Sequence, residues 1–430
     1  MASSEFKEFY QSSGISTDTR ALTKDCLFVC VKGENFDGNT FSKEALKQGA
    51  MHVVVDNIEY FTDKNKMTLV SDSVKYIQQL ANYHRRKFDI PVIGITGSNG
   101  KTTTKELMHA VLSKRYNVLS TIGNLNNHLG VPFTLLRLKS KHEIAIIEMG
   151  ANGFKDIEEL CAIAEPTHGI ITNIGKAHLE GFGDFEGVLK TKRELYEAIE
   201  RVSGKVVINS DDGILIKALP LSIESLDYGT SIKSSIFGGL LSLSPYVNMK
   251  WETKTYRSED IHTQMVGKYN FYNYLAAIAF GVLFEVKNEQ ISAAIKEYTP
   301  TNNRSQVQKT EFNTLIMDCY NANPTSMRSA LDSFAMIDHK DKLFVIGDMK
   351  ELGSESELEH RAIISLIDSL GLTGYTVGTS FAKISSDSVL GSFSTTNELI
   401  EFLASSKHKD RLILLKGSRS IGLEKAAELL

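Results

Sequence analysis

The sequence passes from a short apolar run through a glycine loop into a helical pattern at Val92-Ile93-Gly94-Ile95-Thr96-Gly97-Ser98-Asn99-Gly100-Lys101-Thr102-Thr103-Thr104. Residues 92–96 predict a buried strand. Residues 101–114 predict a helix, because apolar side chains recur there at near-helical spacing. The backbone N–H groups of such a loop, together with the N-terminus of the helix, form a binding site for anions. This segment therefore predicts a phosphate-binding loop between a parallel strand and a helix.

The loop also carries the side chains expected of a nucleotide site. Lys101 is placed to reach the β- and γ-phosphates, and the hydroxyl of Thr102 is placed to bind Mg²⁺. The spacing Gly97-x-x-Gly100 is a shortened form of the usual P-loop pattern, since Ile95 stands where that pattern has a further glycine. The alternative is a tight strand-to-helix turn followed by a chance Lys-Thr pair. The strand before the loop and the helix after it favour nucleotide binding.

Strands and helices alternate on both sides of this loop. Such alternation is typical of parallel sheets that helices cover on both faces. We predict an α/β protein of three domains: a small N-terminal α/β domain (1–85), a central parallel-sheet domain with the P-loop (86–300) and a C-terminal Rossmann-like α/β domain (301–430). Residues 222–264 are serine-rich and look like a β-rich insertion in the central domain. Predicted strands outside the loop lie at 27–31, 51–55, 144–147, 169–174, 206–208, 315–319, 343–346, 375–377 and 412–415.

Length and composition exclude several classes of protein. At roughly 150 residues per domain, 430 residues suggest about three domains. The formal net charge of −4 gives no electrostatic case for nucleic-acid binding. No apolar run approaches the ~18–20 residues that a membrane helix needs, and residues 1–9 lack the apolar core of a signal peptide. Four cysteines without CxxC pairs indicate buried thiols in a reducing compartment. We expect a cytoplasmic monomer without nucleic-acid or membrane partners.

Three further positions suggest a metal site. Glu148 ends a predicted strand, where a carboxylate can hold Mg²⁺ opposite Thr102. His178 lies just past another strand end, and Lys190 and Lys192 lie in a helical pattern. The simpler alternatives are a solvated Glu, a surface or capping His, and a solvated charged helix face.

The loop as a whole resembles the ATP-binding loop of the Mur ligases, the ATP-dependent amide-forming enzymes of peptidoglycan synthesis. The resemblance implies that Glu148, His178 and Lys192 occupy metal positions together with Thr102. It also implies that Lys192 is carbamylated, which turns an amine into a carboxylate-like ligand; Lys190 is the alternative if the register differs. Lys101, Lys192 and His178 are then the catalytic residues.

Several other segments resemble the branch of this family that adds D-alanyl-D-alanine, and they spread over nearly the whole chain. They are 121–132, 318–327, 347–353 with His360, and 416–419, as well as 17–20 and 32–38 near the N-terminus. The implied ATP contacts are Gly97, Ser98, Asn99, Gly100, Lys101, Thr102, Thr103, Asn270, Asn273, Arg304, Asp318 and Asn323. The implied contacts to the UDP substrate are Thr19, Arg20, Lys32, Gly33, Asn35, Asp37, Gly38, Asn124, Asn126 and Asn127.

Two positions depart from the family pattern. Tyr269 stands where the family often has a His, and Asn302-Asn303 precede Arg304 where a Gly is more usual. Asn270 and Asn273 remain beside Tyr269, so contact with the adenine is still expected there.

The resemblance implies ATP and two Mg²⁺ ions as cofactors. UDP-N-acetylmuramoyl-tripeptide and D-alanyl-D-alanine are the implied substrates, joined through an acyl phosphate. His360 or Glu351 is a candidate to take the proton of the attacking amine. Three alternatives remain at this point: another ATP-dependent amide ligase (a different Mur ligase or a folylpolyglutamate synthase), a P-loop ATP-binding module without ligase activity, and an inactive homologue.

Overall fold

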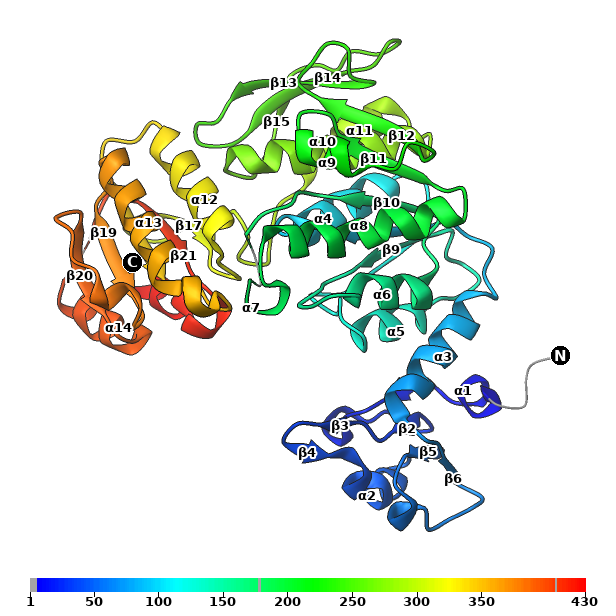
Figure 1. Ribbon diagram of the computed structural model, residues 1–430. Helices are drawn as coiled ribbons and strands as arrows, with labels where there is room; N and C mark the ends of the chain where they lie inside the picture. The colour runs from blue at the N-terminus through cyan, green and yellow to red at the C-terminus, as the bar shows by residue number, and fades with distance from the viewer. Residues whose placement is uncertain (1–5, 177–178, 407) are drawn as a thin grey trace.

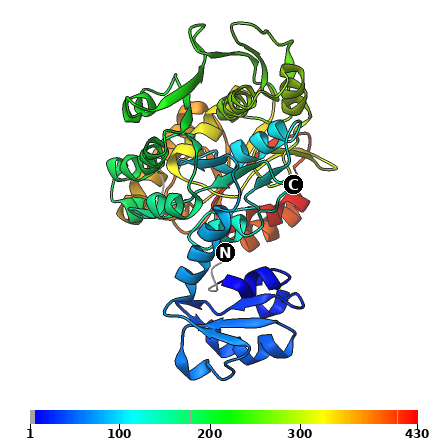
Figure 2. The same cartoon turned by 90° about the vertical axis from the view of Figure 1, so that its right-hand side faces the viewer.

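A computed structural model describes residues 6–176, 179–406 and 408–430. The chain forms three successive α/β units, each built on its own sheet (Figure 1). In Figure 1 the N-terminal unit lies below the middle unit, and the C-terminal unit lies to its left; Figure 2 shows the same arrangement from the side. The predicted three-domain α/β architecture is confirmed. None of the described helices is both long enough and apolar enough to cross a membrane.

The N-terminal unit has a parallel four-stranded sheet in the order β1-β2-β5-β6 and a separate hairpin, β3–β4. The strand predicted at 27–31 ends earlier, at Val29, because the chain turns there toward the hairpin. Helix α3 leads out of this unit and packs on α5 and α6 of the middle unit. The bounds are α1 Lys7–Gln11, β1 Ile15–Ser16, β2 Leu27–Val29, β3 Lys32–Gly33, β4 Phe36–Asp37, α2 Ser42–Lys47, β5 His52–Val55, β6 Met67–Leu69 and α3 Ser73–Arg85.

The middle unit is a nine-stranded sheet in the order β15-β14-β13-β12-β11-β10-β7-β9-β8. Strands β7 to β13 run parallel, β14 is antiparallel to β13, and β15 is antiparallel to β14. The strands are β7 Val92–Thr96, β8 Val118–Ser120, β9 Ile144–Glu148, β10 His168–Ile171, β11 Lys205–Asn209, β12 Glu224–Gly229, β13 Ile236–Ser242, β14 Asn248–Glu252 and β15 Ile261–His262. The helices are α4 Lys101–Leu112, α5 Gly130–Leu135, α6 Asp156–Ala164, α7 Leu179–Phe182, α8 Phe185–Arg201, α9 Gly213–Ala218, α10 Lys268–Leu283 and α11 Asn288–Glu297.

Residues 222–264 are β-rich, as predicted, but they are not an insertion beside the sheet. Strand β12 pairs in parallel with β11, and β13 to β15 extend the same sheet outward. In β14, buried and half-buried residues alternate, as they do in a strand at the margin of a sheet.

Both faces of the middle sheet are covered, and β9 shows how the sequence achieves this. Ile144 and Ile146 point into a core shared with α4, α10 and α11, whereas Ala145 and Ile147 point into the core on the opposite face, with α5, α6 and α8. A strand buried on both faces needs an apolar residue at every position. This requirement explains the uninterrupted apolar run before Glu148.

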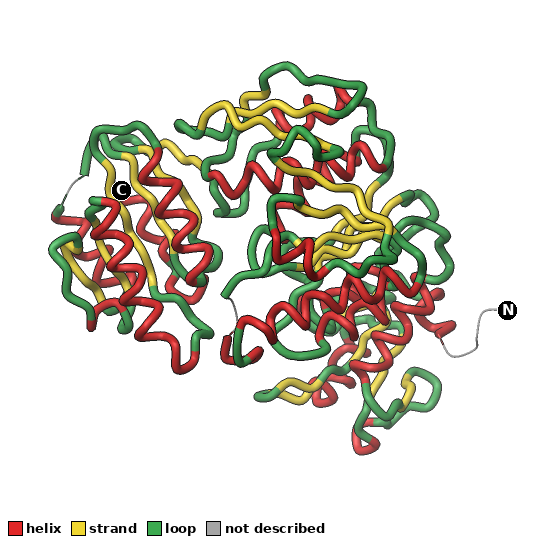
Figure 3. The backbone as a smooth tube through the Cα atoms, turned by 45° about the horizontal axis from the view of Figure 1, so that its top comes forward, coloured by secondary structure: helices red, strands yellow, loops and turns green. Residues whose placement is uncertain are grey.

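The C-terminal unit is a six-stranded sheet in the order β16-β17-β21-β18-β19-β20, in which β16 is antiparallel to β17 and the other strands run parallel. Figure 3 shows helices lying along these strands. The bounds are β16 Gln306–Lys309, β17 Thr314–Asp318, α12 Pro324–Met336, β18 Lys342–Gly347, α13 Ser356–Leu370, β19 Gly374–Val377, β20 Val389–Phe393, α14 Thr396–Ser405 and β21 Leu412–Lys416. All four cysteines are free and buried, as predicted from their spacing.

The core below the phosphate loop can be tested at Ile146. Ile146→Ala removes a side chain with no exposed surface, so we expect the middle unit to lose about 2–5 kcal/mol of unfolding free energy. Trp251 is the only tryptophan and lies in the same core, so its fluorescence during urea unfolding reports on this unit. Leu221→Ala, at a fully exposed position, is the control and should leave the midpoint unchanged. Equal midpoints for the two variants would contradict this account of the core.

Candidate functional site

A cavity of about 860 Å³ lies between the middle and C-terminal units. Its walls include the phosphate loop and the residues that follow β9, β10 and β11, because the carboxyl ends of parallel strands share one edge of the sheet. The C-terminal unit and the chain leading into it supply the opposite wall. Expected site residues in the lining are Ser98, Asn99, Gly100, Lys101, Thr102, Thr103, Asn124, Asn126, Glu148, Asn270, Asn273, Arg304 and Asp318.

Two glycines allow the phosphate loop to fold tightly against its neighbours. Gly97 has φ 141°, and a Cβ there would lie 2.0 Å from Thr172 Oγ1. Gly100 has φ 81°, and a Cβ would lie 2.7 Å from Asn273 Oδ1. Both positive φ values and both close approaches exclude larger residues. Gly97 packs against Thr172 outside the cavity lining, whereas Gly100 lines the cavity.

Lys101 folds back over this loop. Its Nζ donates to the carbonyl of Gly97 at 2.6 Å and to that of Ser98 at 3.3 Å. Burial lowers the pKa of Lys101, Glu148 raises it, and Arg304 lowers it further. The ammonium therefore stands at the mouth of an anion-binding loop and is already held by the carbonyl groups of that loop.

Glu148 is the centre of the expected metal site. Its side chain is 1% exposed, and Oε1 accepts from Thr102 Oγ1 at 3.0 Å and from Asn126 Nδ2 at 2.8 Å. Among the described residues, Oε2 has no hydrogen-bond partner. The ammonium of Lys105 lies 3.8 Å from Oε2, beyond hydrogen-bond distance, so this buried oxygen can still take a cation as a ligand. A hydroxyl and a carboxylate oxygen side by side are ligands that Mg²⁺ prefers, so these residues fit the ion.

The helix α8 distinguishes the two lysines that the sequence left open. Lys192 is 2% exposed and its Nζ lies 5.3 Å from the centre of the Phe182 ring, whereas Lys190 faces solvent. Burial lowers the pKa of Lys192 well below its usual value, and Lys101 lowers it further, while Asp156 and Glu194 raise it. The other expected ligand, His178, lies outside the described residues.

The C-terminal unit contacts the phosphate loop directly. Asn323 caps the N-terminus of α12, and its Nδ2 also donates to Asn99 Oδ1 at 2.8 Å. Thr325 Oγ1 accepts from the backbone N–H of Lys176 at 3.1 Å, and Lys176 Nζ pairs with Glu359 Oε1 at 2.6 Å. Asn323 does not line the cavity; it holds the two units together at the loop.

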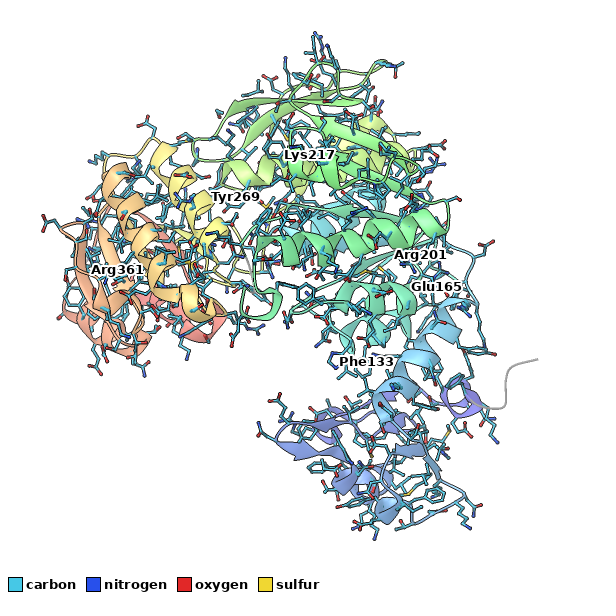
Figure 4. All side chains as sticks on the ribbon, viewed as in Figure 1. Phe133, Glu165, Arg201, Lys217, Tyr269 and Arg361 are labelled. Carbon is cyan, nitrogen blue, oxygen red and sulfur yellow. The ribbon has the colours of Figure 1, made fainter. Side chains whose placement is uncertain are left out.

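The chain that joins the two units is held by a second network. Figure 4 labels Tyr269 near the junction of the units, and its hydroxyl lies 2.8 Å from Ser305 Oγ and 3.5 Å from Asp318 Oδ2. Asp318 Oδ2 accepts from Lys416 Nζ at 2.7 Å. Burial and the charge of Asp318 raise the pKa of Tyr269 well above its usual value, so its phenol is neutral. The residue that departs from the family pattern thus takes part in an interdomain network.

Arg304 and the two asparagines of α10 border the same space. The Arg304 guanidinium lies 3.8 Å from the centre of the Tyr320 ring. Asn273 Oδ1 accepts from Thr104 Oγ1, and Asn273 Nδ2 donates to Asn270 Oδ1. Asn273 therefore fixes the first turn of α4 to α10, and Asn270 extends that network.

The expected UDP contacts near the N-terminus lie apart from this cavity. Among the described residues, Thr19, Arg20, Lys32, Gly33, Asn35, Asp37 and Gly38 all belong to the N-terminal unit, and none of them lines it. Arg20 pairs with Asp18 at 2.8 Å, and this contact lowers the pKa of Asp18 to about 2. Asn127 also lies outside the lining, since its Oδ1 accepts from the N–H groups of Leu129 and Gly130.

His360, a candidate to take the proton of the amine, does not reach the cavity in this structure. Its ring has no exposed surface, Nε2 accepts from the N–H of Met349 at 3.1 Å, and Nδ1 contacts the carbonyl of Ser356 at 2.6 Å. Both nitrogens are used to fix the loop before α13, and His360 is not among the residues that line the cavity. Glu351, the other candidate, also lies outside the cavity lining.

Several described residues of the site carried no expectation. Asp211, Asp212, Lys217 and Tyr272 line the cavity beyond β11, and Lys416 lines it from β21. The pair Asp211-Asp212 follows a strand as Glu148 does, so the same strand-end argument would have identified it. Lys105 could not be found in this way, because it lies inside a helix and is completely buried.

Comparison with known proteins shows the same three parts in the same order. Residues 11–92 match the Mur ligase family catalytic domain, 95–281 the Mur ligase middle domain, and 303–419 the Mur ligase glutamate ligase domain. The chain is 33% identical to a UDP-N-acetylmuramoyl-tripeptide–D-alanyl-D-alanine ligase of Bacillus subtilis, over 96% of this chain and 91% of that protein. A ligase of the same name from Escherichia coli is also 33% identical, over 97% and 93% of the two chains.

Solved structures agree with these relatives. A crystal structure of MurF from Acinetobacter baumannii is 29% identical with a TM-score of 0.88, covering 99% of this chain and 97% of that one. The MurF ligase of Thermotoga maritima in complex with ADP is 26% identical with a TM-score of 0.87, covering 96% of each chain.

The contact between Lys176 and Glu359 predicts how firmly the C-terminal unit is held. Glu359→Gln should loosen this unit and increase the radius of gyration in small-angle X-ray scattering, because it removes the charge from a nearly buried partner. Lys176→Gln should give the same change, and the double variant should add nothing. Arg361→Gln is the control, since Arg361 pairs with Glu357 within α13 (Figure 4). An additive double variant would contradict the proposed pairing.

Proposed function

The chain belongs to the Mur ligase family, and on that premise we propose that it joins D-alanyl-D-alanine to UDP-N-acetylmuramoyl-tripeptide with hydrolysis of ATP. The observation that carries this proposal is the likeness, over nearly the full length, to ligases of that name. The site supports it, because a phosphate loop, a buried carboxylate and a second α/β unit meet at one cavity.

The proposed reaction has two steps, a phosphoryl transfer and an acyl transfer. An oxygen of the terminal carboxylate of the tripeptide attacks the γ-phosphorus of ATP, the bond to the bridging oxygen breaks, and ADP leaves. The amine of D-alanyl-D-alanine then attacks the acyl carbon, loses a proton, and phosphate leaves. Catalysis of such transfers is mainly positioning and stabilisation of charge.

The phosphate loop supplies the positioning. We assign the phosphates to the N–H groups of residues 97–102, with Lys101 Nζ turning from the loop carbonyls toward the γ-phosphate. Thr102 and Glu148 would hold Mg²⁺, which neutralises phosphate charge when bound. Asn270, Asn273, Arg304, Asp318 and Asn323 belong on the nucleotide side of this assignment, and His178 remains a proposed metal ligand on sequence grounds.

Lys192 is proposed to act as a carbamate. Its buried amine has a lowered pKa, and the uncharged amine is the form that adds CO₂, releasing one proton. Lys101 and Lys192 repel each other as two cations, and a carbamate on Lys192 turns this repulsion into attraction. The carbamate on Lys192 would then be a ligand of a second Mg²⁺ beside the first.

The three units are proposed to divide the work. Residues 1–85 hold the UDP end through Thr19, Arg20, Lys32, Gly33, Asn35, Asp37 and Gly38, residues 86–300 bind ATP and carry Asn124, Asn126 and Asn127 toward the same substrate, and residues 301–430 close over the nucleotide. Closure protects the acyl phosphate from water. We further propose that the protein acts as a monomer in the cytoplasm.

The substrate assignment is tested by ADP release with a panel of UDP-muramoyl tripeptides. ADP should form over many turnovers only when D-alanyl-D-alanine and a tripeptide are both present, and single amino acids should not replace the dipeptide. ATP hydrolysis independent of both co-substrates would reject the ligase assignment.

Lys101→Ala should reduce ligation by at least about a thousandfold, because the transferred phosphoryl group loses its direct side-chain cation. Circular dichroism should show an unchanged fold, since Lys101 contributes no core packing. Lys114→Ala is the matched control: Lys114 follows the same helix and pairs with Glu297 away from the cavity. Substantial turnover by Lys101→Ala would refute the phosphate role.

Lys192→Ala should be inactive and should regain part of its activity on addition of short carboxylates such as formate or acetate, which can stand in for the carbamate. Lys190 lies two residues before Lys192 in the same helix and is exposed to solvent, so Lys190→Ala should keep normal activity without added carboxylate. The measurement is initial rate against carboxylate concentration. Activity of Lys192→Ala equal to that of the unmodified chain, without carboxylate, would reject the carbamate.

A further inference from the structure

Lys105 is a charged residue that the proposed reaction does not use. It lies one turn after Lys101 in α4, has no exposed surface, and is not part of the cavity lining. Burying an ammonium group is costly unless it is fully hydrogen-bonded, and an apolar side chain would fill the same volume without that cost. Its presence in the core therefore needs a reason.

Lys105 contacts its helix neighbour Glu106 and three groups near the functional site. Its Nζ donates to the carbonyl of Thr121 at 2.7 Å and to that of Gly123 at 3.3 Å. It also lies 3.0 Å from Glu106 Oε1 and 3.8 Å from Glu148 Oε2. One ammonium thus joins the helix of the phosphate loop to the segment 121–126 and to the buried carboxylate.

The segment 121–126 is held to the core at its two ends, and at its far end the N–H of Gly150 donates to the carbonyl of Asn126 at 2.8 Å. It follows β8 without regular secondary structure, and Ile122, Gly123, Asn124 and Leu125 are exposed. Thr121 anchors its beginning, since its N–H donates to the carbonyl of Ile146 and its Oγ1 accepts from the N–H of Glu148. Beyond Thr121, the contact from Lys105 to the Gly123 carbonyl ties the turn to the core of the middle unit.

The end of this segment enters the cavity. Asn124 and Asn126 both line it, and Asn126 also donates to Glu148 Oε1. A shift of the 121–123 backbone would therefore move Asn124 directly, and would act on Asn126 against its hydrogen bonds to Gly150 and Glu148.

We propose that Lys105 is a positioning residue that couples the phosphate-loop helix to segment 121–126, and so sets the affinity for the UDP-muramoyl substrate. It touches neither ATP nor the substrate in this scheme; it acts through the carbonyls of Thr121 and Gly123. The proposal rests on the assignment of Asn124 and Asn126 to that substrate under the proposed function.

The test compares Lys105→Met, which keeps the volume without the charge, with Lys105→Arg, which keeps the charge and the donors. Calorimetric titration without Mg²⁺ should show binding of UDP-muramoyl tripeptide weakened about tenfold in Lys105→Met, the loss of about one hydrogen bond to a charged group. Binding of a non-hydrolysable ATP analogue should change less than about threefold. Lys105→Arg should recover part of the lost affinity. In steady state, KM for the UDP substrate should rise more than kcat falls.

A merely structural role predicts a different pattern. Lys105→Met would then lower the melting temperature and weaken both ligands equally, or leave substrate affinity unchanged, and either result overturns the proposal. Should Lys105→Met not fold, Lys105→Gln keeps one donor and should show the same preference for weakened UDP-substrate binding. Lys114→Met is the control for removing a lysine from this helix region, and should change neither affinity.

Asn124→Ala separates this proposal from the one on which it rests. If Asn124→Ala weakens the UDP substrate and Lys105→Met does not, the coupling by Lys105 is wrong and the substrate assignment stands. If Asn124→Ala leaves affinity unchanged while Lys105→Met lowers it selectively, the segment assignment must move to Asn126, and the coupling by Lys105 is retained.

Discussion

The hydrogen bond between Thr102 and Glu148 is the contact on which the site depends. It joins the first turn of the phosphate-loop helix to the end of a neighbouring parallel strand, and it does so in the interior, where Glu148 is 1% exposed. Among the described residues, Glu148 Oε2 has no hydrogen bond, and the buried ammonium of Lys105 lies 3.8 Å from it, so the carboxylate is stabilised by charge and keeps one oxygen open to a further cation. The sheet order places β7 directly beside β9, so the short side chain of Thr102 is enough to reach the Glu148 carboxylate.

The C-terminal unit depends on the same loop from the other side. Asn323 must cap α12 and also reach Asn99, so the orientation of this unit is tied to the conformation of the phosphate loop. Tyr269, Ser305 and Asp318 fix the connecting chain at a second point. Two separate points of attachment define the orientation of a rigid unit far better than one. The cavity between the units therefore has a defined shape in this arrangement.

How much the sequence predicts depends on whether the signal is local. Residues 92–96 were predicted as a strand and form β7, because apolar run, glycine loop and helix start coincide within a few residues. Strand-end residues such as Glu148 were also predictable, since β-strand ends of a parallel sheet share an edge. The β-rich character of residues 222–264 was predictable, but their place in the sheet was not, because the pairing of β12 with β11 is set by distant partners.

Other parts of the site depend on burial, which sequence patterns do not determine. Lys190 and Lys192 have the same side chain and lie two residues apart, yet only Lys192 is buried. His360 follows the segment 347–353, which resembles the family, but the backbone of Met349 and Ser356 occupies both ring nitrogens. The difference between a functional and a structural ionisable residue lies in the tertiary contacts of its polar atoms, which become known only once the chain is folded.

The charge of the cavity gives a physical reason for the proposed metal ions. Its described lining carries as many cations as anions: Lys101, Lys217, Arg304 and Lys416 stand against Glu148, Asp211, Asp212 and Asp318. Lys416 is already paired with Asp318, and Lys101 is held by loop carbonyls. ATP and the UDP substrate are both anions, so the side chains alone do not supply an excess of positive charge. The backbone N–H groups of the loop and the proposed Mg²⁺ ions would supply the positive charge that the phosphates need. This balance explains why a buried carboxylate, which would otherwise repel the nucleotide, stands at the centre of the site.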